Sequence, residues 1–256
     1  IAEAGINHNG SIKEAIRLIK VAKTTKADFI KFQIFKSENV ATEHAKKSSY
    51  QKKNSKDFES QLQMIRKYEL KYSLFKKIKN ECKKNKINFL CSPFDIESLN
   101  YLKSIGEKII KIPSGEITNY PLLREIGKMK KSAILSSGMS NLIEIDNAIK
   151  VLTKFGTKKK NISVLHCITS YPAPFNQLGL SAIKQIKDKF KVNVGFSDHS
   201  QGTEASIAAV ALGAKIIEKH LTLSRKLDGP DHKSSLSPNE FTAMVSAIRN
   251  IEKAIK

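Results

Sequence analysis

The sequence predicts a closed (β/α)8 TIM barrel, and three observations carry that prediction. Short apolar runs alternate with amphipathic helical stretches along all 256 residues, a pattern typical of a parallel sheet with helical crossovers. Eight strand–helix units in about 250 residues match the size of such a barrel. The alternative, an open doubly wound sheet, normally carries a GxGxxG loop after its first strand, and GINHNGS lacks that spacing. We therefore expect one barrel domain over residues 1–256.

The strands are expected where short runs rich in β-branched and aromatic residues stand between helical segments. In chain order these are residues 1–5, 28–33, 87–92, 108–114, 132–137, 161–166, 192–197 and 214–219. Helices are expected at residues 12–24, 72–85, 95–105, 120–129, 141–155, 178–188, 202–212 and 238–255. In the first helix, Ile12, Ile16 and Ile19 recur near the 3.6-residue period, and Ser11 is a candidate N-cap.

One connection, residues 34–71, is far longer than the usual loop of about 2–6 residues. It begins with a polar stretch, KSENVATEHAKKSSYQKKNSKD, and continues with FESQLQMIRKYEL, whose apolar residues fit an amphipathic helix. On a barrel, an insertion after a strand lies on the catalytic face. We expect a lid or a substrate loop here, because the helical second half argues against a linker without structure.

Composition argues against several classes of protein. The formal net charge of +21 suggests nucleic-acid binding, but the excess is mostly lysine on helix faces, with five arginines and no tryptophan. Nucleic-acid recognition relies more on arginine and clustered aromatic residues. No run approaches the ~18 apolar residues of a membrane span. Three widely spaced cysteines without a CxxC pattern indicate a reduced, cytoplasmic protein.

Polar side chains stand where the predicted strands end, which is where the active sites of barrel enzymes gather. Converging hydroxyls, lysines and imidazoles predict a pocket for a small, oxygen-rich anion, whereas a set of polar turns is the simpler alternative. The residues, from the first strand to the last, are Glu3, Asn7, His8, Lys31, Gln33, Ser92, Lys111, Ser114, Glu116, Ser136, Ser137, His166, Thr169, Tyr171, Ser197, His199, Glu218 and His220.

His199 and His220 are separated by about one strand–helix unit, which places them at the same height on neighbouring strands. Two neutral imidazoles are a reasonable start for a divalent metal site, with water or substrate in the remaining positions. Capping or hydrogen-bonded core histidines are the alternative, and spacing alone leaves both open. Asp198 either orients a ligand or forms a turn. Structural or exposed positions are expected for the remaining histidines, His8, His44, His166 and His232.

Lys31 and Lys111 interrupt apolar strands, and lysine is rarely buried without a partner. They either bind an anion by charge or, in a second hypothesis, one of them forms a Schiff base as in lysine-dependent aldolases. Lysines that extend to solvent at the barrel mouth are a third possibility. The first hypothesis is favoured by the nearby hydroxyl donors Ser92, Ser114, Ser136 and Ser197.

Three carboxylates are candidates for proton transfer. Glu3 lies in the first strand, Glu116 follows the fourth, and Asp231 sits in LDGPDHK, where Gly229 and Pro230 fix a turn that can aim it at the pocket. Alternatively, the two glutamates neutralise nearby lysines, and Asp231 belongs to a surface turn.

The order of nine segments resembles the sialic acid synthase family, whose members make N-acetylneuraminate or the related legionaminate and pseudaminate. The resemblance covers essentially the whole chain. It is carried by EAGINHNG, IKFQ, SPFD, KIPSGEITNYPLL, ILSSGM, LHCITSYPAP, GFSDHS, ALGAKIIEKHLT and GPDHKSSLSP.

The resemblance implies an aldol-type condensation of phosphoenolpyruvate with a 2-acetamido sugar aldehyde and water, giving a nonulosonic acid and phosphate. For an N-acetylneuraminate synthase the sugar is N-acetylmannosamine. The alternative is a legionaminate synthase acting on 2,4-diacetamido-2,4,6-trideoxymannose, because ESQLQM is similar to both branches. Two less favoured hypotheses are a Schiff-base aldolase and a basic binding protein whose barrel has no catalytic activity.

Site residues follow from the resemblance position by position. It implies that His199 and His220 hold Mn²⁺ or Mg²⁺, that Glu116 and Asp231 hold the sugar or assist proton transfer, and that Glu3 positions water. Thr169, implied to bind the substrate near its phosphate, stands where some relatives carry Asn. Binding of phosphoenolpyruvate is implied for Lys31, Lys111, Ser114, Ser136 and Ser197, with Gln33, Ser92 and Tyr171 nearby.

The family also implies partners for the barrel. We expect small-molecule substrates, a homodimer, and a small antifreeze-like domain after the barrel that contributes an arginine to the partner's active site. The sequence ends at Lys256 without that domain and opens at Ile1 within the pattern of the first strand, so a preceding segment is also expected. Neither nucleic acid nor a membrane is expected as a partner.

Overall fold

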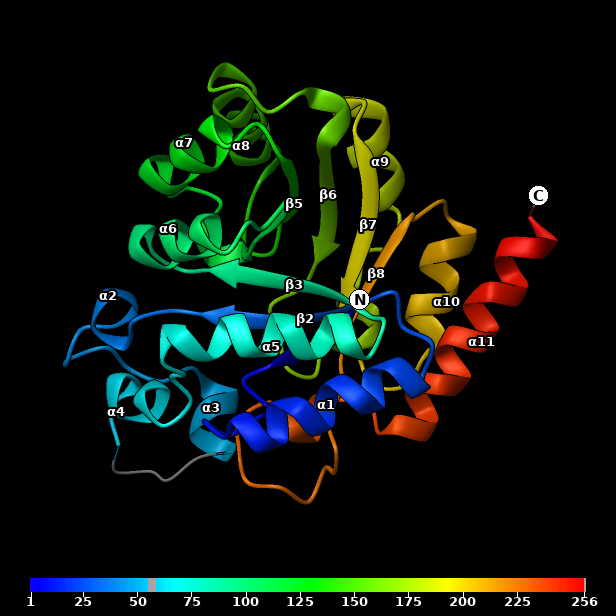
Figure 1. The fold of residues 1–256 in the computed structure, drawn as a ribbon. Coiled ribbons are helices and arrows are strands. Elements are labelled where there is room, and N and C mark those ends of the chain that lie inside the picture. The colour runs from blue at the N-terminus through cyan, green and yellow to red at the C-terminus, as the bar shows by residue number, and fades with distance from the viewer. Residues whose placement is uncertain (55–58, 256) are drawn as a thin grey trace.

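Eight parallel strands pair in chain order and close into a barrel in the computed structural model, which describes residues 1–54 and 59–255. Figure 1 shows these strands surrounded by helices. The predicted (β/α)8 TIM barrel is therefore confirmed. Its strands are β1 (Ala2–Gly5), β2 (Phe29–Ile34), β3 (Asn88–Pro93), β4 (Ile109–Ile112), β5 (Ser132–Ser136), β6 (Ile162–Cys167), β7 (Asn193–Asp198) and β8 (Ile216–His220).

Each strand is followed by a helix that returns the chain to the amino end of the next strand. All eight predicted helices are present. They are α1 (Ile12–Thr24), α5 (Tyr72–Lys84), α6 (Ile96–Ser104), α7 (Tyr120–Lys128), α8 (Leu142–Lys154), α9 (Ala182–Phe190), α10 (Glu204–Ala211) and α11 (Pro238–Ala254). In α1, Ser11 caps the helix as predicted, and its Oγ accepts the backbone N–H of Glu14 at 3.4 Å.

Five boundaries differ from the prediction by two residues or more, and a single residue explains two of these differences. Strand β4 ends at Ile112 instead of 114, since Pro113 has no N–H for the ladder and a turn of 3-10 helix follows. Helix α9 begins at Ala182 instead of 178, because Gly179 adopts φ +54, which a helix does not accept. Strand β8 and helix α10 each begin two residues late, at Ile216 and Glu204, and α9 ends two residues late, at Phe190.

The barrel has two apolar layers. The larger one fills the space between strands and helices, and residues such as Phe32, Phe196 and Phe241 are almost completely buried there. A smaller cluster of Leu90 and Ile134, together with Leu165, packs inside the barrel. Because Lys31 pairs in register with Leu90, and Lys111 with Ile134, the two lysines lie at the level of this inner plug.

The insertion after β2 forms three short helices on the catalytic side of the barrel: α2 (Ser37–Val40), α3 (Ser49–Asn54) and α4 (Gln61–Arg66). In Figure 1 they lie on the side to which the arrowhead of β2 points. Ser60 and Gln63 form a capping box at the start of α4. An apolar cluster separate from the barrel core anchors the insertion: Ile6, Phe35, Ala41, Leu62, Met64 and Ile65. Residues 55–58 of the predicted polar stretch lie outside the described residues.

Two expectations from composition can be compared with the fold. Cys82, Cys91 and Cys167 are all buried and unpaired. Within residues 1–54 and 59–255, no helix combines the length and the apolar character needed to cross a membrane.

Candidate active site

A cavity of about 410 Å³ opens at the carboxyl ends of the barrel strands. Its lining side chains come from β1, β2, β4, β5, β6, β7 and β8 and from the segments that follow the strands, so closure of the barrel is what assembles them. Of the residues to which the resemblance assigns a role, all but two line it: Glu3, Lys31, Gln33, Lys111, Ser114, Ser136, Thr169, Tyr171, Ser197, His199, His220 and Asp231. The wider set of polar residues at the strand ends also included Asn7, His8, Ser137 and His166, which do not line this cavity.

Ser92 and Glu116 lie outside this wall. Ser92 pairs in register with Gln33, but its short side chain is buried, and its Oγ has no hydrogen-bond partner. Glu116 is half-buried in the turn after β4 and accepts a hydrogen bond from Asn119 Nδ2 at 2.6 Å. The roles implied for these two residues stay predictions.

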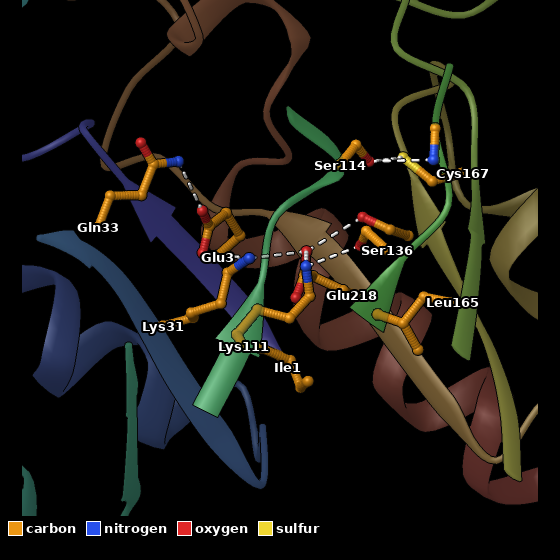
Figure 2. A network of polar contacts seen from close by, with 12 residues as sticks. Ile1, Glu3, Lys31, Gln33, Lys111, Ser114, Ser136, Leu165, Cys167 and Glu218 are labelled. Atoms are coloured by element: carbon orange, nitrogen blue, oxygen red, sulfur yellow. Dashed lines mark hydrogen bonds and ion pairs between the residues drawn. The ribbon is translucent and has the colours of Figure 1, made fainter. Parts of the chain in front are cut away.

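Two buried lysines and two buried glutamates form the floor of the cavity, as Figure 2 shows. Lys31 Nζ lies 2.8 Å from Glu218 Oε1 and 3.5 Å from Glu3 Oε2. Lys111 Nζ lies 3.5 Å from the same oxygen of Glu218 and donates a hydrogen bond to Ser136 Oγ at 2.7 Å. The carboxylate of Glu218 is therefore the point at which both lysines meet.

The charges of this floor follow from competition between burial and ion pairing. Burial alone would raise the pKa of Glu218, but Lys111 and Lys31 outweigh it and hold that pKa well below its usual range. Burial would lower the pKa of Lys31, yet Glu218 and Glu3 raise it above the ordinary value. For Lys111 burial dominates and lowers the pKa to about 8. Glu218 and Lys31 thus stay charged at neutral pH, whereas Lys111 is poised near deprotonation.

Glu3 is the floor carboxyl that titrates near neutrality. Burial raises its pKa to about 7, although Lys31 acts in the opposite direction. Gln33 Nε2 donates a hydrogen bond to Glu3 Oε1 at 3.0 Å, while Oε2 has no hydrogen-bond partner. A carboxyl with a pKa near the working pH and an oxygen that accepts no hydrogen bond is suited to general acid–base chemistry.

A second group of donors lies at the β5 side of the cavity. Gly138, in the loop after β5, donates its N–H to Ser114 Oγ at 3.0 Å. A Cβ added to Gly138 would lie 2.6 Å from Thr169 Cγ2 and 2.8 Å from Ser114 Oγ, so only glycine lets this loop approach both. Ser114 Oγ also contacts Cys167 Sγ at 3.7 Å. The close approach places the hydroxyl groups of Ser114 and Thr169 in the wall of the cavity that also contains the lysines.

The two predicted metal ligands lie side by side in the wall of the cavity. Their ring centroids are 5.5 Å apart, as expected for neighbouring strands. His199 Nδ1 lies 2.6 Å from the carbonyl oxygen of Ile168, which leaves Nε2 as the free nitrogen. His220 Nδ1 is buried without a hydrogen-bond partner, 3.9 Å from Asp231 Oδ2.

The protonation of the two rings differs. Burial and the neighbouring His199 keep the pKa of His220 well below its usual value, so this ring is neutral and has a lone pair to donate. Burial also lowers the pKa of His199, but Cys167 and the Ile168 carbonyl outweigh it, and the pKa lies above the ordinary value. A proton therefore competes with any cation at His199.

The arrangement fits a divalent ion with two protein ligands. An unpartnered buried nitrogen on His220 and a free nitrogen on His199 are the donors that such an ion requires. In the described part of the chain, no group of three or more His, Cys, Asp or Glu side chains is placed to enclose a metal. Oxygen atoms of water or substrate would complete the coordination.

The insertion contributes an aromatic wall. The ring of Tyr50, in α3, stacks on Tyr171 at 4.8 Å between centroids, and Tyr171 lies 4.1 Å from the ring of His199. The predicted position of the insertion on the catalytic face is therefore confirmed, since it lines the same cavity as the histidines.

Three residues of this site have roles that the sequence did not assign. Glu218 lies two residues before His220, and the two-residue period of a strand, which turns His220 inward, also turns Glu218 inward. Cys167, at the end of β6, contacts His199 Nδ1 at 3.7 Å. Tyr50 gave no signal, because it stands in a polar stretch without periodicity.

The other histidines occupy structural or exposed positions, as predicted. His8 Nδ1 accepts the backbone N–H of Gly10 at 3.1 Å. His166 Nε2 lies 2.6 Å from the carbonyl oxygen of Leu178. A contact of 2.7 Å joins His232 Nδ1 to Thr222 Oγ1, and His44 is exposed.

Such a cavity at the carboxyl ends of eight parallel strands defines a (β/α)8-barrel enzyme. The chain belongs to the NeuB family, whose model matches residues 18–256. The predicted resemblance to the sialic acid synthase family is therefore confirmed.

Individual relatives cover the whole chain. The N,N'-diacetyllegionaminic acid synthase of Campylobacter jejuni is 52% identical over 255 residues, which are 100% of this chain and 76% of that protein. The synthase of the same name from Legionella pneumophila is 37% identical over 260 residues, which span 100% of this chain and 72% of that protein. The crystal structure of N-acetylneuraminic acid (sialic acid) synthetase from Leptospira borgpetersenii in complex with citrate superposes with a TM-score of 0.87. It is 35% identical, over 99% of this chain and 83% of that one.

Proposed function

We propose that this chain condenses phosphoenolpyruvate with a 2-acetamido sugar aldehyde and water, giving a nonulosonic acid and phosphate. The observation that supports this most is the floor of the cavity. Lys31 and Lys111 are buried there among the hydroxyls of Ser136 and Ser197, directly at the carboxyl ends of the strands. Buried cations surrounded by hydroxyl donors suit a small substrate that carries phosphate and carboxylate.

Binding of phosphoenolpyruvate is assigned to the lysines as charges. Lys31 stays protonated at neutral pH, and Glu218 keeps both ammonium groups stable when no anion is present. Ser136 and Ser197 add donors to the oxyanions. Held in this way, the enol carbon C3 is oriented toward the aldehyde, and the charge of the departing phosphate is stabilised.

The reaction balances with two carboxyl groups of the site. C3 of phosphoenolpyruvate bonds to the aldehyde carbon, whose oxygen gains a proton, and water adds at C2. The bond from C2 to the phosphate oxygen then breaks, phosphate leaves with the electron pair, and C2 becomes a ketone. Glu3, with a pKa of about 7, takes the proton of the water. Asp231, whose pKa burial raises to about 6, lies near His220 and supplies the proton that the aldehyde oxygen gains. The proton of the hydroxyl formed at C2 leaves with the phosphate.

Mn²⁺ or Mg²⁺ bound by His199 and His220 would supply a Lewis acid for the aldehyde oxygen. The chain itself fixes the orientation of the two histidine rings, and therefore the place at which the aldehyde oxygen would bind. The bond of His199 Nδ1 to the Ile168 carbonyl sets the direction of one ring, and Tyr171 packs against both rings, at 4.1 and 5.7 Å between centroids.

The proposed preferred sugar is 2,4-diacetamido-2,4,6-trideoxymannose, the legionaminate precursor, with N-acetylmannosamine as the second candidate. Identity is 52% to a named legionaminic acid synthase and 35% to a named sialic acid synthetase. The cavity also has an apolar side: Ile6, Phe35, Met64, Ile65 and Phe94 line it next to the insertion. Such a wall suits the methyl group of a 6-deoxy sugar, because a hydroxyl there would lose hydrogen bonds to water.

Phosphate release tests the proposal. Full-length protein is incubated with phosphoenolpyruvate, Mn²⁺ and each of the two sugars in turn. We expect release with both and a higher kcat/KM, by up to about 100-fold, for the 6-deoxy sugar. No release with either sugar would contradict the condensation, and a preference for N-acetylmannosamine would contradict only the choice of sugar.

Borohydride trapping separates this scheme from a Schiff-base aldolase. Lys111 is the better candidate for a Schiff base, because its lowered pKa of about 8 makes the amine available as a nucleophile. Its ammonium donates to Ser136 and pairs with Glu218, which favours a role as a charge. We expect no covalent adduct in the presence of substrates, and a reduced adduct on Lys111 or Lys31 would contradict the proposal.

A homodimer of the full-length protein is also proposed. Most of the large apolar side chains that are exposed in the described residues stand in the segments that follow the strands or in the first turns of the next helices, on the face of the barrel where the cavity opens. Exposed apolar side chains gathered on one face suggest an interaction site. The side chains on this face are Val40, Ile96, Tyr120, Met139, Leu142, Ile143, Phe175 and Leu227. Light scattering of the full-length protein should give the mass of a dimer, and a monomer at micromolar concentration would contradict it.

A further inference from the structure

Directly behind the histidine pair lies an ion pair that the proposed chemistry does not use. Lys219 Nζ is 2.9 Å from Asp198 Oδ2, and both side chains are 0% exposed. Burying two charges requires that most of their hydrogen-bonding capacity be satisfied, and replacement by well-packed apolar residues is often no less stable. The pair therefore calls for an explanation other than stability.

The position of the pair in the sheet is its most informative feature. Asp198 and Lys219 are register partners on the adjacent strands β7 and β8, and each immediately precedes one histidine, His199 or His220. Because successive side chains of a strand point to opposite faces, the ion pair lies on the helix side of the sheet while the imidazoles face the cavity. One cross-strand contact thus ties together the two backbone segments that carry the rings.

Further hydrogen bonds extend the ion pair into a closed network. Asp198 Oδ1 accepts the N–H and the hydroxyl of Ser200, at 2.8 and 2.6 Å. Asp198 Oδ2 accepts the hydroxyl of Ser206, in α10, at 2.6 Å. Lys219 Nζ also donates to the carbonyl oxygen of Ser200 at 2.6 Å. His199 therefore stands between two residues, Asp198 and Ser200, that are both bound to Lys219.

The orientation of the His220 ring depends on this network more than that of the His199 ring does. His199 Nδ1 has its own contact with the Ile168 carbonyl, whereas His220 Nδ1 has no hydrogen-bond partner. The direction of the His220 ring is therefore set by the backbone around it and by packing. The backbone at Lys219 is fixed through the side chain that reaches Asp198 and Ser200.

We propose that Asp198 and Lys219 are positioning residues that hold His199 and His220 at the separation and angle a shared divalent cation requires. This inference rests on the proposed metal site. Neither residue touches the cation or the substrate. They act through the two histidines, in the way that outer partners of metal ligands usually do, by limiting the freedom of the ligands before the ion arrives.

The test measures binding of Mn²⁺ alone, by titration calorimetry and by the electron paramagnetic resonance of the bound ion, on metal-free full-length protein. The main variant, Asp198→Asn with Lys219→Met, removes both charges and nearly keeps the volume. The matched control, Lys79→Met with Glu107→Gln, removes an ion pair of 3.1 Å between α5 and the segment that leads into β4, at the amino end of the barrel. His220→Ala is the reference for loss of a ligand.

We expect the main variant to fold and to bind Mn²⁺ about 10–100-fold more weakly than the wild type, with an altered resonance spectrum. The control variant should bind Mn²⁺ within about twofold of the wild type, because its pair lies away from the histidines. Thermal midpoints of both variants show whether a loss of metal affinity merely follows a loss of stability.

Each outcome separates this inference from the proposed function. A folded main variant that binds Mn²⁺ as tightly as the wild type would overturn the positioning role. Wild-type affinity in His220→Ala would instead overturn the metal site itself. If the main variant does not fold, Ser206→Ala carries the test, since it removes one hydrogen bond from Asp198. We expect Mn²⁺ binding several-fold weaker there, and unchanged affinity contradicts the proposal.

Discussion

Substituting Glu218 by glutamine should destabilise the empty protein and, at the same time, tighten its binding of phosphoenolpyruvate. Glu218 Oε1 lies 2.8 Å from Lys31 Nζ and 3.5 Å from Lys111 Nζ, and the three side chains are at most 5% exposed. Removing one partner of a buried ion pair costs about 3–5 kcal/mol. For a chain of this size, about 2–4 °C of thermal midpoint corresponds to each kcal/mol, so the midpoint should fall by about 6–20 °C.

The ligand dependence is the more specific part of this prediction. Without Glu218, two lysines face each other across the floor, and an anion takes over the role of the carboxylate. Recovering only about 1.4 kcal/mol of the lost stability on binding would make the Kd of phosphoenolpyruvate tenfold lower. Turnover should fall nevertheless, since the Glu218→Gln variant no longer holds the lysines in place after phosphate leaves.

The assay is thermal unfolding and calorimetric titration with phosphoenolpyruvate, for the Glu218→Gln variant and for a control. Glu125→Gln is the matched control, because Glu125 also lies between two cations, Arg124 at 3.1 Å and Lys128 at 2.8 Å, but on the surface. Exposed pairs are worth at most about 1 kcal/mol. An unchanged midpoint together with an unchanged Kd in the Glu218→Gln variant would refute the charge network of the floor.

Three further predictions concern the same cavity. His220→Ala should abolish turnover and keep the far-ultraviolet circular dichroism of the wild type, and wild-type turnover would contradict the metal role. The kcat/KM should rise with pH through about 7, as Glu3 ionises, and fall above about 8, as Lys111 loses its proton. Glu3→Gln should remove the acid limb, and a profile that keeps this limb argues against Glu3 as the base. Tyr50→Ala should raise the KM for the sugar more than the KM for phosphoenolpyruvate, because Tyr50 packs on Tyr171 beside the histidines and away from the floor.

The fold was predictable from the sequence because one physical unit repeats. Each strand is a short apolar run and each helix has a 3.6-residue apolar stripe, and the two periods are easy to tell apart. Most boundaries lie within one residue of the prediction, and a local backbone property explains two of the larger differences, at Pro113 and Gly179. The pairing of His199 with His220 was predictable for the same reason, since residues one unit apart come to the same end of neighbouring strands.

The remaining parts of the site depend on information that spacing does not carry. The function of Glu218 follows from contacts with two lysines on other strands, which only the closed barrel creates. Tyr50 reaches Tyr171 across the mouth from an insertion without regular periodicity. For Asp198 the sequence left two roles open, orienting a ligand or forming a turn. The contact that favours the first role is the ion pair with Lys219, which lies on another strand. Side-chain partners between strands distant in sequence are therefore what the structure adds.

The apolar cluster beneath the insertion has an evolutionary consequence. Leu62, Met64 and Ile65 pack against Ile6 and Phe35 in a group of their own, apart from the layer that joins strands to helices. Mutations there loosen one small unit and spare the folding of the scaffold, while altering the wall that we assign to the sugar. Proteins that descend from one ancestral gene can thus come to use different sugar aldehydes while they keep the same phosphoenolpyruvate chemistry.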